Sequence, residues 1–416
     1  MLIHSASQLL TLAGGPQRGN ELGRLGILQD GAVLVRGERI EAVGSSADLR
    51  SAYPDEPGLD AQGHVVLPGF VDPHTHLVWA GDRAHEFEMR LQGKTYMEIM
   101  AAGGGIVSTV RSTRKASHEE LLEQTRARAE SMFRYGTTTA EAKTGYGLEI
   151  KAELRQMSVL LALDEEGPIE IAPTFLGAHA VPVEYRENAE GYTREVCERM
   201  LPALLEWWQQ HTPTRSLPFV DVFCETGAFD LDQSRRILET ARHTGFPLKI
   251  HADEFDNLGG ARMAAELSAA SADHLVKTSA SDIQALAASN TVAVALPCTP
   301  FGLADPHYTP AREILAAGGL LAIASDINPG TAWCESMQFV IALACGYLRL
   351  TPAQAIAAAT INAAAAIRRA DCIGSIEPGK QADLLILSVS DYRHLGYRFG
   401  TNLVQTVIKR GKVYPV

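Results

Sequence analysis

Short apolar runs alternate with longer amphipathic stretches between residues 70 and 325. The apolar runs have the length and composition of buried strands, and the stretches between them repeat their apolar positions at helical spacing. The predicted strands are 70–74, 137–142, 169–176, 219–224, 247–251, 272–274, 292–296 and 320–325. The predicted helices include 121–134, 149–163, 232–244 and 280–287. Strands and helices in this order predict an α/β fold, a (β/α)8 barrel of the TIM type.

Both ends of the chain are rich in predicted strands instead. Residues 32–44 predict a hairpin that turns at Arg36-Gly37-Glu38, residues 382–387 predict a strand, and residues 404–413 predict a second hairpin. Termini of this kind are expected to meet in a small β-sandwich. The predicted domains are therefore a composite β-sandwich, residues 1–66 plus 371–416, and a barrel, residues 67–370. A doubly wound sheet is the alternative, but no Gly-x-Gly-x-x-Gly follows an early strand.

The composition narrows the choice of partners. The 416 residues are 46% hydrophobic and 21% charged, which is typical of a globular protein in water. The net charge of -12 and the lack of a dense Lys/Arg stripe argue against nucleic acid. No apolar run is long enough to span a bilayer, so no membrane partner is expected. The six cysteines form no Cys-x-x-Cys pair, which favours free thiols in the cytoplasm.

Polar residues gather where the predicted barrel strands end. His74 and His76 follow the first strand and point to the same side of an extended chain. His251 ends the fifth strand, and Asp326 follows the eighth. Because these strand ends share one mouth of a barrel, we expect three imidazoles and a carboxylate to meet there. Such a set suits one Zn²⁺ or Fe³⁺ ion per subunit, with a position left for water.

Other strand-end residues supply candidate acid–base groups. Glu254 follows His251 by three residues and is placed to carry a proton from water to a leaving nitrogen, although a solvent-facing glutamate at a helix start is the alternative. His274 is expected to orient the water or stabilise an oxyanion, with a buried core histidine as the alternative. The predicted catalytic residues are Glu254, His274 and Asp326. The fourth strand ends in Glu225 without a lysine, which favours one metal, with Glu225 as a bridging ligand in the alternative.

The strand-end set resembles the amidohydrolase superfamily, and further motifs resemble the imidazolonepropionase family within it. These motifs lie at residues 73–77, 80–83, 103–106, 143–148, 174–182, 326–331 and 374–380. The resemblance covers essentially the whole chain. It implies a metal-dependent hydrolase of cyclic amide C–N bonds that converts 4-imidazolone-5-propanoate to N-formimidoyl-L-glutamate in histidine degradation. It also implies a homodimer.

The resemblance carries residue roles onto matching positions. It implies the same four metal ligands, and it implies substrate or product contacts by Arg83, Tyr146, His179, Glu254, Asn328, Gly330 and Thr331. An arginine suits the propionate tail of the substrate as a charge-assisted clamp, whereas a surface ion pair with Asp82 or Glu86 is the alternative. Tyr96 is a further candidate contact. Residues 332–335 are less typical of the family, so the loop shape there is left open.

Two other functions compete with this hypothesis. A metal-dependent deaminase of a nucleobase-like ring shares the His-x-x-Glu spacing of His251 and Glu254. Arg83 separates the two, because a neutral base needs no carboxylate clamp. A non-catalytic barrel that serves as a scaffold is the second competitor, and the intact metal-ligand set argues against it.

Overall fold

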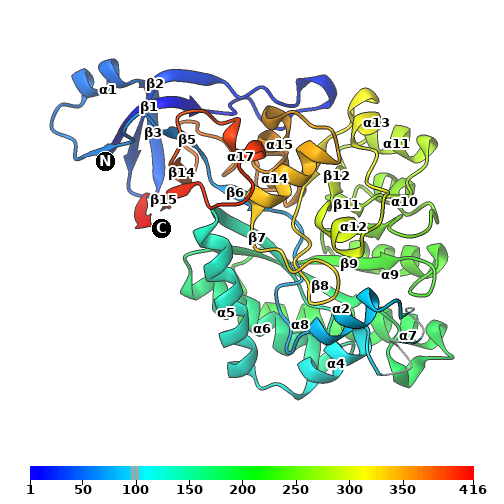
Figure 1. Ribbon diagram of the computed structural model, residues 1–416. Coiled ribbons are helices and arrows are strands. Elements are labelled where there is room, and N and C mark those ends of the chain that lie inside the picture. Colours follow the sequence, from blue (N-terminus) through cyan, green and yellow to red (C-terminus); the bar gives the residue numbers. More distant parts are fainter. Residues whose placement is uncertain (95–97, 99–102) are drawn as a thin grey trace.

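A computed structural model describes residues 1–94, 98 and 103–416 of the chain, and its main feature is a parallel barrel (Figure 1). The barrel strands follow one another around the sheet in chain order, each paired in parallel with the next. They are β6 (Phe70–Asp72), β7 (Thr137–Lys143), β8 (Glu170–Ala178), β9 (Phe219–Cys224), β10 (His251–Ala252), β11 (Ser271–His274), β12 (Val292–Ala295) and β13 (Leu321–Ile323). The predicted (β/α)8 fold is confirmed.

Backbone hydrogen bonds just beyond β6 and β13 close the barrel. The His76 amide donates to the Ile327 carbonyl at 2.9 Å, and the Asp326 amide donates to the His74 carbonyl at 3.1 Å. The amide of Ser325 also donates to the Asp72 carboxylate at 3.1 Å. Residues that lie some 250 positions apart in the chain are therefore neighbours at the barrel mouth.

Helices cover the outside of the barrel (Figure 1). Their starts are set by polar caps; Ser117 and Glu120, for example, form a reciprocal capping box that begins α5. The described α-helices are α1 (Ser46–Ala52), α2 (Ala84–Leu91), α4 (Ile106–Lys115), α5 (His118–Arg134), α6 (Ile150–Glu166), α7 (Ala189–Glu195), α8 (Leu201–His211), α9 (Leu231–His243), α10 (Gly260–Glu266), α11 (Ala280–Ala287), α12 (Cys298–Leu303), α13 (Ala311–Ala316), α14 (Met337–Gly346), α15 (Pro352–Ala358), α16 (Ile361–Ala366) and α17 (His394–Tyr397).

A second sheet joins the two ends of the chain (Figure 1). Its strand order is β16-β15-β14-β5-β1-β2-β3, and β4 pairs with β1. The strands are β1 (Leu2–Leu10), β2 (Ile27–Arg36), β3 (Arg39–Ser45), β4 (Gly58–Asp60), β5 (Val65–Pro68), β14 (Leu384–Leu387), β15 (Val404–Lys409) and β16 (Lys412–Pro415). Both termini thus meet in one unit, as the sequence predicts, and where it predicts a β-sandwich the structure has one mixed sheet. The domain boundaries at residues 66/67 and 370/371 stay a prediction.

Glu170 connects the barrel with this second sheet. Its carboxylate lies 3.1 Å from the Lys409 ammonium and accepts hydrogen bonds from Arg369 at 2.5 Å and Gln381 at 2.9 Å. Burial alone would raise the pKa of Glu170, but Lys409 and Arg369 outweigh burial and lower it to about 2. The side chain is 17% exposed, so solvent screens these charges only in part.

We expect Glu170→Gln to lower the free energy of unfolding by about 3 kcal/mol at neutral pH, since one pKa unit corresponds to about 1.4 kcal/mol. The folded pKa is depressed, so the stabilisation is present above the ordinary glutamate pKa of 4.5 and is lost as the pH falls toward 2. Urea unfolding at pH 7 and pH 3 measures this. Wild type should lose more stability between the two pH values than the variant, and equal losses would contradict the account.

Candidate active site

The structure brings the four predicted metal ligands together at the carboxyl ends of the barrel strands. Asp326 Oδ1 lies 3.4 Å from His74 Nε2 and 3.5 Å from His76 Nε2. His251 Nε2 lies 3.1 Å from His76 Nε2. All four side chains are at most 3% exposed. Residues from β10 and from the extensions of β6 and β13 therefore share one centre.

This centre fits a metal ion better than a set of hydrogen bonds. The buried atoms His74 Nε2 and Asp326 Oδ1 have no hydrogen-bond partner among the described residues. Ligands about 2.0–2.2 Å from a tetrahedral ion lie roughly 3.3–3.6 Å apart, close to the distances observed here. Burial lowers the pKa of His74 and of His76 well below the ordinary value, which keeps both rings in the neutral form that binds metals. The arrangement can therefore hold a metal.

His274 belongs to a second, overlapping group of candidate ligands with His74 and His251. Ligand atoms within each group lie within 4.8 Å of one another. The ring of His274 is also 5.2 Å from the ring of His251, centre to centre. His274 thus lies within reach of the same centre, and its predicted role in orienting the reacting groups stays a prediction.

Two carboxylates beneath the centre orient the histidines. Asp273 Oδ2 lies 2.6 Å from His74 Nδ1, and Asp221 Oδ2 lies 3.0 Å from His251 Nδ1. A carboxylate on one ring nitrogen fixes the imidazole and leaves the other nitrogen for the metal. Sequence reasoning missed both residues. For Asp221 the available signal was one acidic residue inside the otherwise apolar run Phe219–Cys224, because such a residue is costly to bury without a partner. Asp273, between Ala272 and His274, carries no such signal.

Two fully buried lysines balance these carboxylates. Lys143 Nζ lies 2.8 Å from Glu141 Oε1 and 2.9 Å from Asp221 Oδ2, while Lys249 Nζ lies 3.5 Å from Asp273 Oδ2. Burial alone would lower the pKa of Lys143, but Asp221 and Glu141 raise it, so the ammonium stays charged. Sequence reasoning also missed this ionic layer, whose partners become neighbours only through the pairing of separate strands.

Asp326 is held in a strained backbone position. Its φ is 52°, in the left-handed region that side chains other than glycine rarely adopt. The second carboxylate oxygen accepts a hydrogen bond from Thr299. Burial raises the pKa of Asp326 to about 6. Strain of this kind persists where the surrounding contacts fix a functional side chain.

Glu254 and His274 face one another beside the centre. Glu254 Oε2 lies 3.6 Å from His274 Nε2, and the Glu254 side chain is 11% exposed. Burial raises the pKa of Glu254 well above its ordinary value, and the nearby charge of Asp326 adds to this. Burial lowers the pKa of His274 well below its ordinary value. A carboxyl group with a raised pKa next to a neutral imidazole is suited to accept and release a proton.

The residues predicted to bind substrate lie on the same side of the barrel. The ring of His179 stacks on that of His76 at 4.8 Å, and Tyr146 lies 5.3 Å from His179, both measured between ring centres. Burial raises the pKa of Tyr146, so its hydroxyl stays protonated and can donate a hydrogen bond. Burial lowers the pKa of His179 to about 3, so its ring is neutral at pH 7.

Arg83 is not engaged in a close surface ion pair. Its nearest contact to Glu86 is 3.9 Å, and the Glu86 carboxylate instead accepts hydrogen bonds from Gly105 and Ser108. The Arg83 side chain is only 14% exposed, and its Nε has no hydrogen-bond partner among the described residues. The guanidinium packs on Gly330, where a Cβ atom would lie 1.7 Å from Nη2. A glycine at 330 therefore makes room for this arginine.

Asn328 organises the loop that carries Gly330 and Thr331. Its side-chain oxygen accepts hydrogen bonds from the amides of Gly330 and Thr331, both at 2.8 Å, and its side-chain nitrogen donates to the Asp326 carbonyl at 2.7 Å. These bonds use most of the hydrogen-bonding capacity of the amide. Asn328 thus shapes the loop, while its contact with substrate or product stays a prediction.

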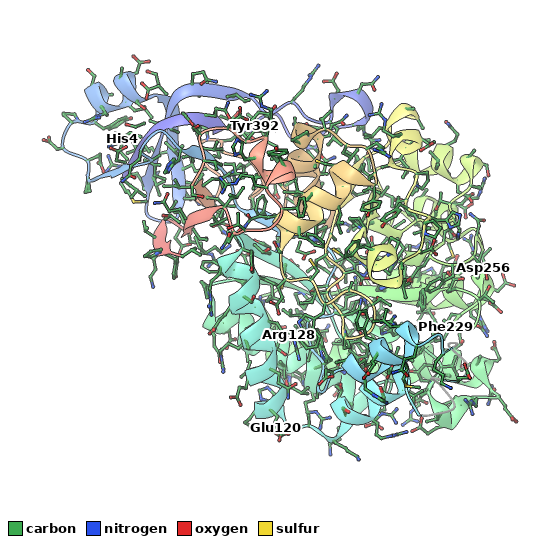
Figure 2. All side chains as sticks on the ribbon, viewed as in Figure 1. His4, Glu120, Arg128, Phe229, Asp256 and Tyr392 are labelled. Carbon is green, nitrogen blue, oxygen red and sulfur yellow. The ribbon has the colours of Figure 1, made fainter. Side chains whose placement is uncertain are left out.

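The loop at residues 332–335 is anchored by aromatic contacts. The Trp333 ring meets Trp79 edge to face at 5.0 Å, and its Nε1 donates to Glu335 at 3.1 Å. The guanidinium of Arg128, labelled in Figure 2, lies 3.5 Å from the centre of the Trp79 ring. The shape that the sequence left open is thus set by packing against Trp79. The other candidate contact, Tyr96, lies outside the described residues.

Glu225 has a different environment from the one expected of a bridging ligand. Its carboxylate accepts hydrogen bonds from the amides of Phe255 at 2.9 Å and Asp256 at 3.1 Å. Among the described residues, neither group of candidate metal ligands includes it. The geometry therefore favours the single-metal hypothesis.

Comparisons with known proteins agree with this architecture. Residues 65–414 match a model of the amidohydrolase family, and residues 31–55 match a model of the imidazolonepropionase-like composite domain of bacteria. A protein named imidazolonepropionase from Herpetosiphon aurantiacus is 51% identical over 99% of this chain and 96% of its own. A second, from Chloroflexus aggregans, is 51% identical over 99% of this chain and 98% of its own.

A solved structure extends the likeness in fold. A mutant atrazine chlorohydrolase from Arthrobacter aurescens, complexed with zinc and atraton, matches with a TM-score of 0.75 over 100% of this chain and 96% of its own, at 16% identity. That identity shows the fold alone. The family matches and the two relatives show more: the chain belongs to the amidohydrolase family and, within it, to the imidazolonepropionases.

Proposed function

We propose that the chain hydrolyses the ring C–N bond of 4-imidazolone-5-propanoate and releases N-formimidoyl-L-glutamate, a step of histidine degradation. The relatives named imidazolonepropionase support this activity. The observation that carries it is the combination at one barrel mouth of a centre that can hold a metal and Arg83, a largely buried cation whose contact with the Glu86 carboxylate, at 3.9 Å, is longer than a hydrogen bond. A ring substrate with a carboxylate tail needs both features.

The metal centre is proposed to consist of His74, His76, His251 and Asp326. These residues would hold one Zn²⁺ or Fe³⁺ ion per subunit, since imidazole and carboxylate ligands suit both metals. The bound ion would act as a Lewis acid and would lower the pKa of a water ligand from about 15.7 to about 7. The ionic layer under the centre would keep the rings of His74 and His251 in place.

Residues of the chain itself carry out the proton transfer and stabilise the developing charge. Glu254 accepts the proton of the attacking water and delivers it to the departing ring nitrogen, a transfer suited to its raised pKa. His274 is neutral because burial lowers its pKa, and it donates a hydrogen bond to the carbonyl oxygen as negative charge develops there. Asp326, fixed by Thr299, orients the water for attack.

The substrate-binding residues surround this centre. Arg83 holds the propionate carboxylate, and Tyr146 and His179 bind the carboxylate or the ring from the face next to His76. Gly330, Thr331 and Asn328 complete the contacts to substrate or product through their shared loop. Glu254, which moves the proton, also contacts the ring nitrogen.

We expect Arg83→Met to raise KM about 30- to 150-fold and to change kcat only slightly. A charge-assisted hydrogen bond to a carboxylate contributes about 2–3 kcal/mol, which corresponds to this ratio. Steady-state kinetics measure it, and metal content should stay unchanged. An imidazolone without the propionate tail is the matched control, because the substitution should not affect its KM. An unchanged KM for the full substrate would contradict the role of Arg83.

The activity itself is tested with purified wild-type protein. Incubation with 4-imidazolone-5-propanoate should yield N-formimidoyl-L-glutamate, identified by NMR. A parallel assay for ammonia release from nucleobase rings tests the deaminase alternative. Conversion of the imidazolone supports the proposal, whereas ammonia release from a neutral base without ring opening of the imidazolone would overturn it.

We also propose a homodimer that works in the cytoplasm. The dimer follows from the family resemblance. All six cysteines are free, which fits a reducing compartment. Among the described residues, no helix has both the length and the apolar character needed to cross a membrane. Light scattering of the purified protein tests the dimer, and a monomeric mass would contradict it.

A further inference from the structure

We propose that two buried glutamates, Glu153 and Glu225, are positioning residues that divide the work of the site: Glu153 fixes substrate binding and Glu225 fixes proton transfer. Each carboxylate accepts hydrogen bonds from at least two backbone amides of one loop at the barrel mouth. Each loop carries a different functional side chain, Tyr146 in one case and Glu254 in the other. The proposal rests on the proposed function and assigns roles to residues that do not themselves touch the substrate.

The loop around Tyr146 is held by hydrogen bonds to the Glu153 carboxylate. Glu153 lies in the first turns of α6 and is fully buried. One of its oxygens accepts hydrogen bonds from the amides of Gly147 at 2.7 Å and Leu148 at 2.8 Å, and the other accepts from Gly145 at 2.9 Å. The donors flank Tyr146 on both sides. The Glu153 side chain therefore fixes the backbone conformation on both sides of Tyr146.

Two glycines allow this close approach. Gly145 has a φ of 115°, which other residues rarely adopt, and a Cβ atom on Gly147 would lie 2.8 Å from the Cβ atom of Ala152. The Gly145 carbonyl also lies 3.0 Å from Nδ1 of His179. Glu153 thus positions His179 as well as Tyr146. Both are candidate substrate contacts, and neither is a candidate for the proton transfer.

The loop around Glu254 is fixed in the same way by Glu225. Glu225 follows β9 and is 2% exposed. It accepts hydrogen bonds from the amides of Phe255 at 2.9 Å and Asp256 at 3.1 Å, the two residues directly after Glu254, and from Thr226 at 2.8 Å. Asp256 lies at the edge of the molecule (Figure 2), so this loop runs from the centre out to the surface.

Asp253 holds the other side of Glu254. Its backbone is left-handed, with a φ of 56°, and its carboxylate accepts a hydrogen bond from Thr278 at 2.6 Å. The carbonyl of Asp253 accepts another from the amide of Lys277 at 2.7 Å. With anchors before and after it, Glu254 is directed toward His274, 3.6 Å away. Glu225 therefore acts on Glu254, the proton carrier, whereas Glu153 acts on Tyr146 and His179.

A carboxylate suits both positions because it accepts hydrogen bonds and donates none. Each glutamate meets three amide donors, so a glutamine would turn an NH₂ group toward at least one of them. A buried amide left without a partner costs about 1–3 kcal/mol, and the loop can avoid this cost only by moving. A shift of about 1 Å at a reacting group can lower a rate about 100-fold.

The test compares three matched substitutions, Glu153→Gln, Glu225→Gln and Glu170→Gln. Glu170 lies at the opposite end of the barrel and serves as the control. We expect Glu153→Gln to raise KM, and the Kd of a carboxylate-bearing imidazole analogue, about 10-fold or more with kcat within about 3-fold of wild type. We expect Glu225→Gln to lower kcat about 10-fold or more with KM and that Kd within about 3-fold. The control should change neither, and metal content should stay at the wild-type level in all three.

Several results would overturn the proposal. Equal changes in kcat and KM in both variants would show a general loss of structure, and loss of metal in Glu225→Gln would make Glu225 a ligand. If Glu153→Gln fails to fold, Gly147→Ala replaces it, because the added Cβ atom pushes the same loop away. If Glu225→Gln fails to fold, Glu225→Asp replaces it. Gly147→Ala should raise KM and Glu225→Asp should lower kcat, and any other pattern overturns the proposal.

Failure of the proposed function gives a distinct result. In that case wild-type protein leaves the imidazolone unchanged. The analogue Kd still reports on Glu153, and amide hydrogen exchange at Phe255 and Asp256 still reports on Glu225. Faster exchange at these two amides in Glu225→Gln, together with weaker analogue binding in Glu153→Gln alone, supports the positioning roles, and their absence contradicts them.

Discussion

Glu254→Gln should lower kcat by about 10²–10⁴-fold and leave KM nearly unchanged, because a positioned proton-transfer group contributes about that factor. Glutamine keeps the size of the side chain and its distance of 3.6 Å to His274, but it cannot carry the proton. Burial raises the pKa of Glu254 well above its ordinary value, which suits a group that accepts and releases a proton. Steady-state kinetics on metal-loaded protein measure the effect.

Asp256→Asn provides the matched control. Asp256 lies two residues farther along the same loop, and its side chain is exposed. The substitution removes an acid of similar type and should leave both kcat and KM unchanged. If Glu254→Gln kept more than about a tenth of the wild-type kcat, the proton would have to travel by another group, and the assigned role would be wrong.

His251→Asn should abolish stoichiometric metal binding and lower kcat by about 10³-fold or more. Lewis-acid catalysis supplies several kcal/mol of transition-state stabilisation, which is lost with the ion. His251 Nε2 faces His76 Nε2 at 3.1 Å, so asparagine would leave one side of the centre open. Metal analysis after gel filtration, run beside the kinetic assay, measures both effects.

Asp221→Asn gives a graded comparison. Asp221 contacts Nδ1 of His251 at 3.0 Å and lies on the far side of the ring from the centre. Loss of such an outer partner typically weakens metal binding about 10- to 100-fold without abolishing it.

The result that contradicts the His251→Asn prediction is equal metal content and equal activity in the variant and in wild type. That result would remove His251 from the ligand set.

The barrel could be predicted because its signal is local. Each strand is a short buried run, and the structure has eight strands in the predicted order, although the fifth, predicted at 247–251, is the two-residue strand His251–Ala252. The ends of the elements differ for physical reasons. The helix predicted at 121–134 begins three residues earlier, at His118. Its first turn follows the capping box of Ser117 and Glu120, which is polar, so the spacing of apolar residues does not show where the helix begins. The strand predicted at 320–325 ends at Ile323, because the chain leaves the sheet to place Asp326.

Of the candidate site, only the residues that lie at strand ends could be predicted from the sequence. His74, His76, His251 and Asp326 stand out in that way, and the structure places them within 3.1–3.5 Å of one another along the contacts His251–His76, His76–Asp326 and His74–Asp326. The residues beneath and beside them do not. Asp273 lies below the centre because β11 pairs in register with β10 and places it beside His251. No local pattern in the sequence shows such a register.

The positions of Glu153 and Glu225 illustrate the same limit. From the sequence, Glu153 is one polar residue in a helix, and Glu225 is a strand-end acid that suits a metal. The structure places both among backbone amides of the mouth loops. An acceptor that shapes a loop has no sequence signature of its own, apart from the glycines of that loop.

The central claim is that one metal ion at the barrel mouth supports the hydrolysis. Its most direct test is reconstitution of metal-free protein, prepared with a chelator, by stepwise addition of Zn²⁺. Formation of N-formimidoyl-L-glutamate should rise in proportion to added metal and level off at one equivalent per chain. Full turnover by the metal-free protein, or a plateau reached only at two equivalents, would contradict it.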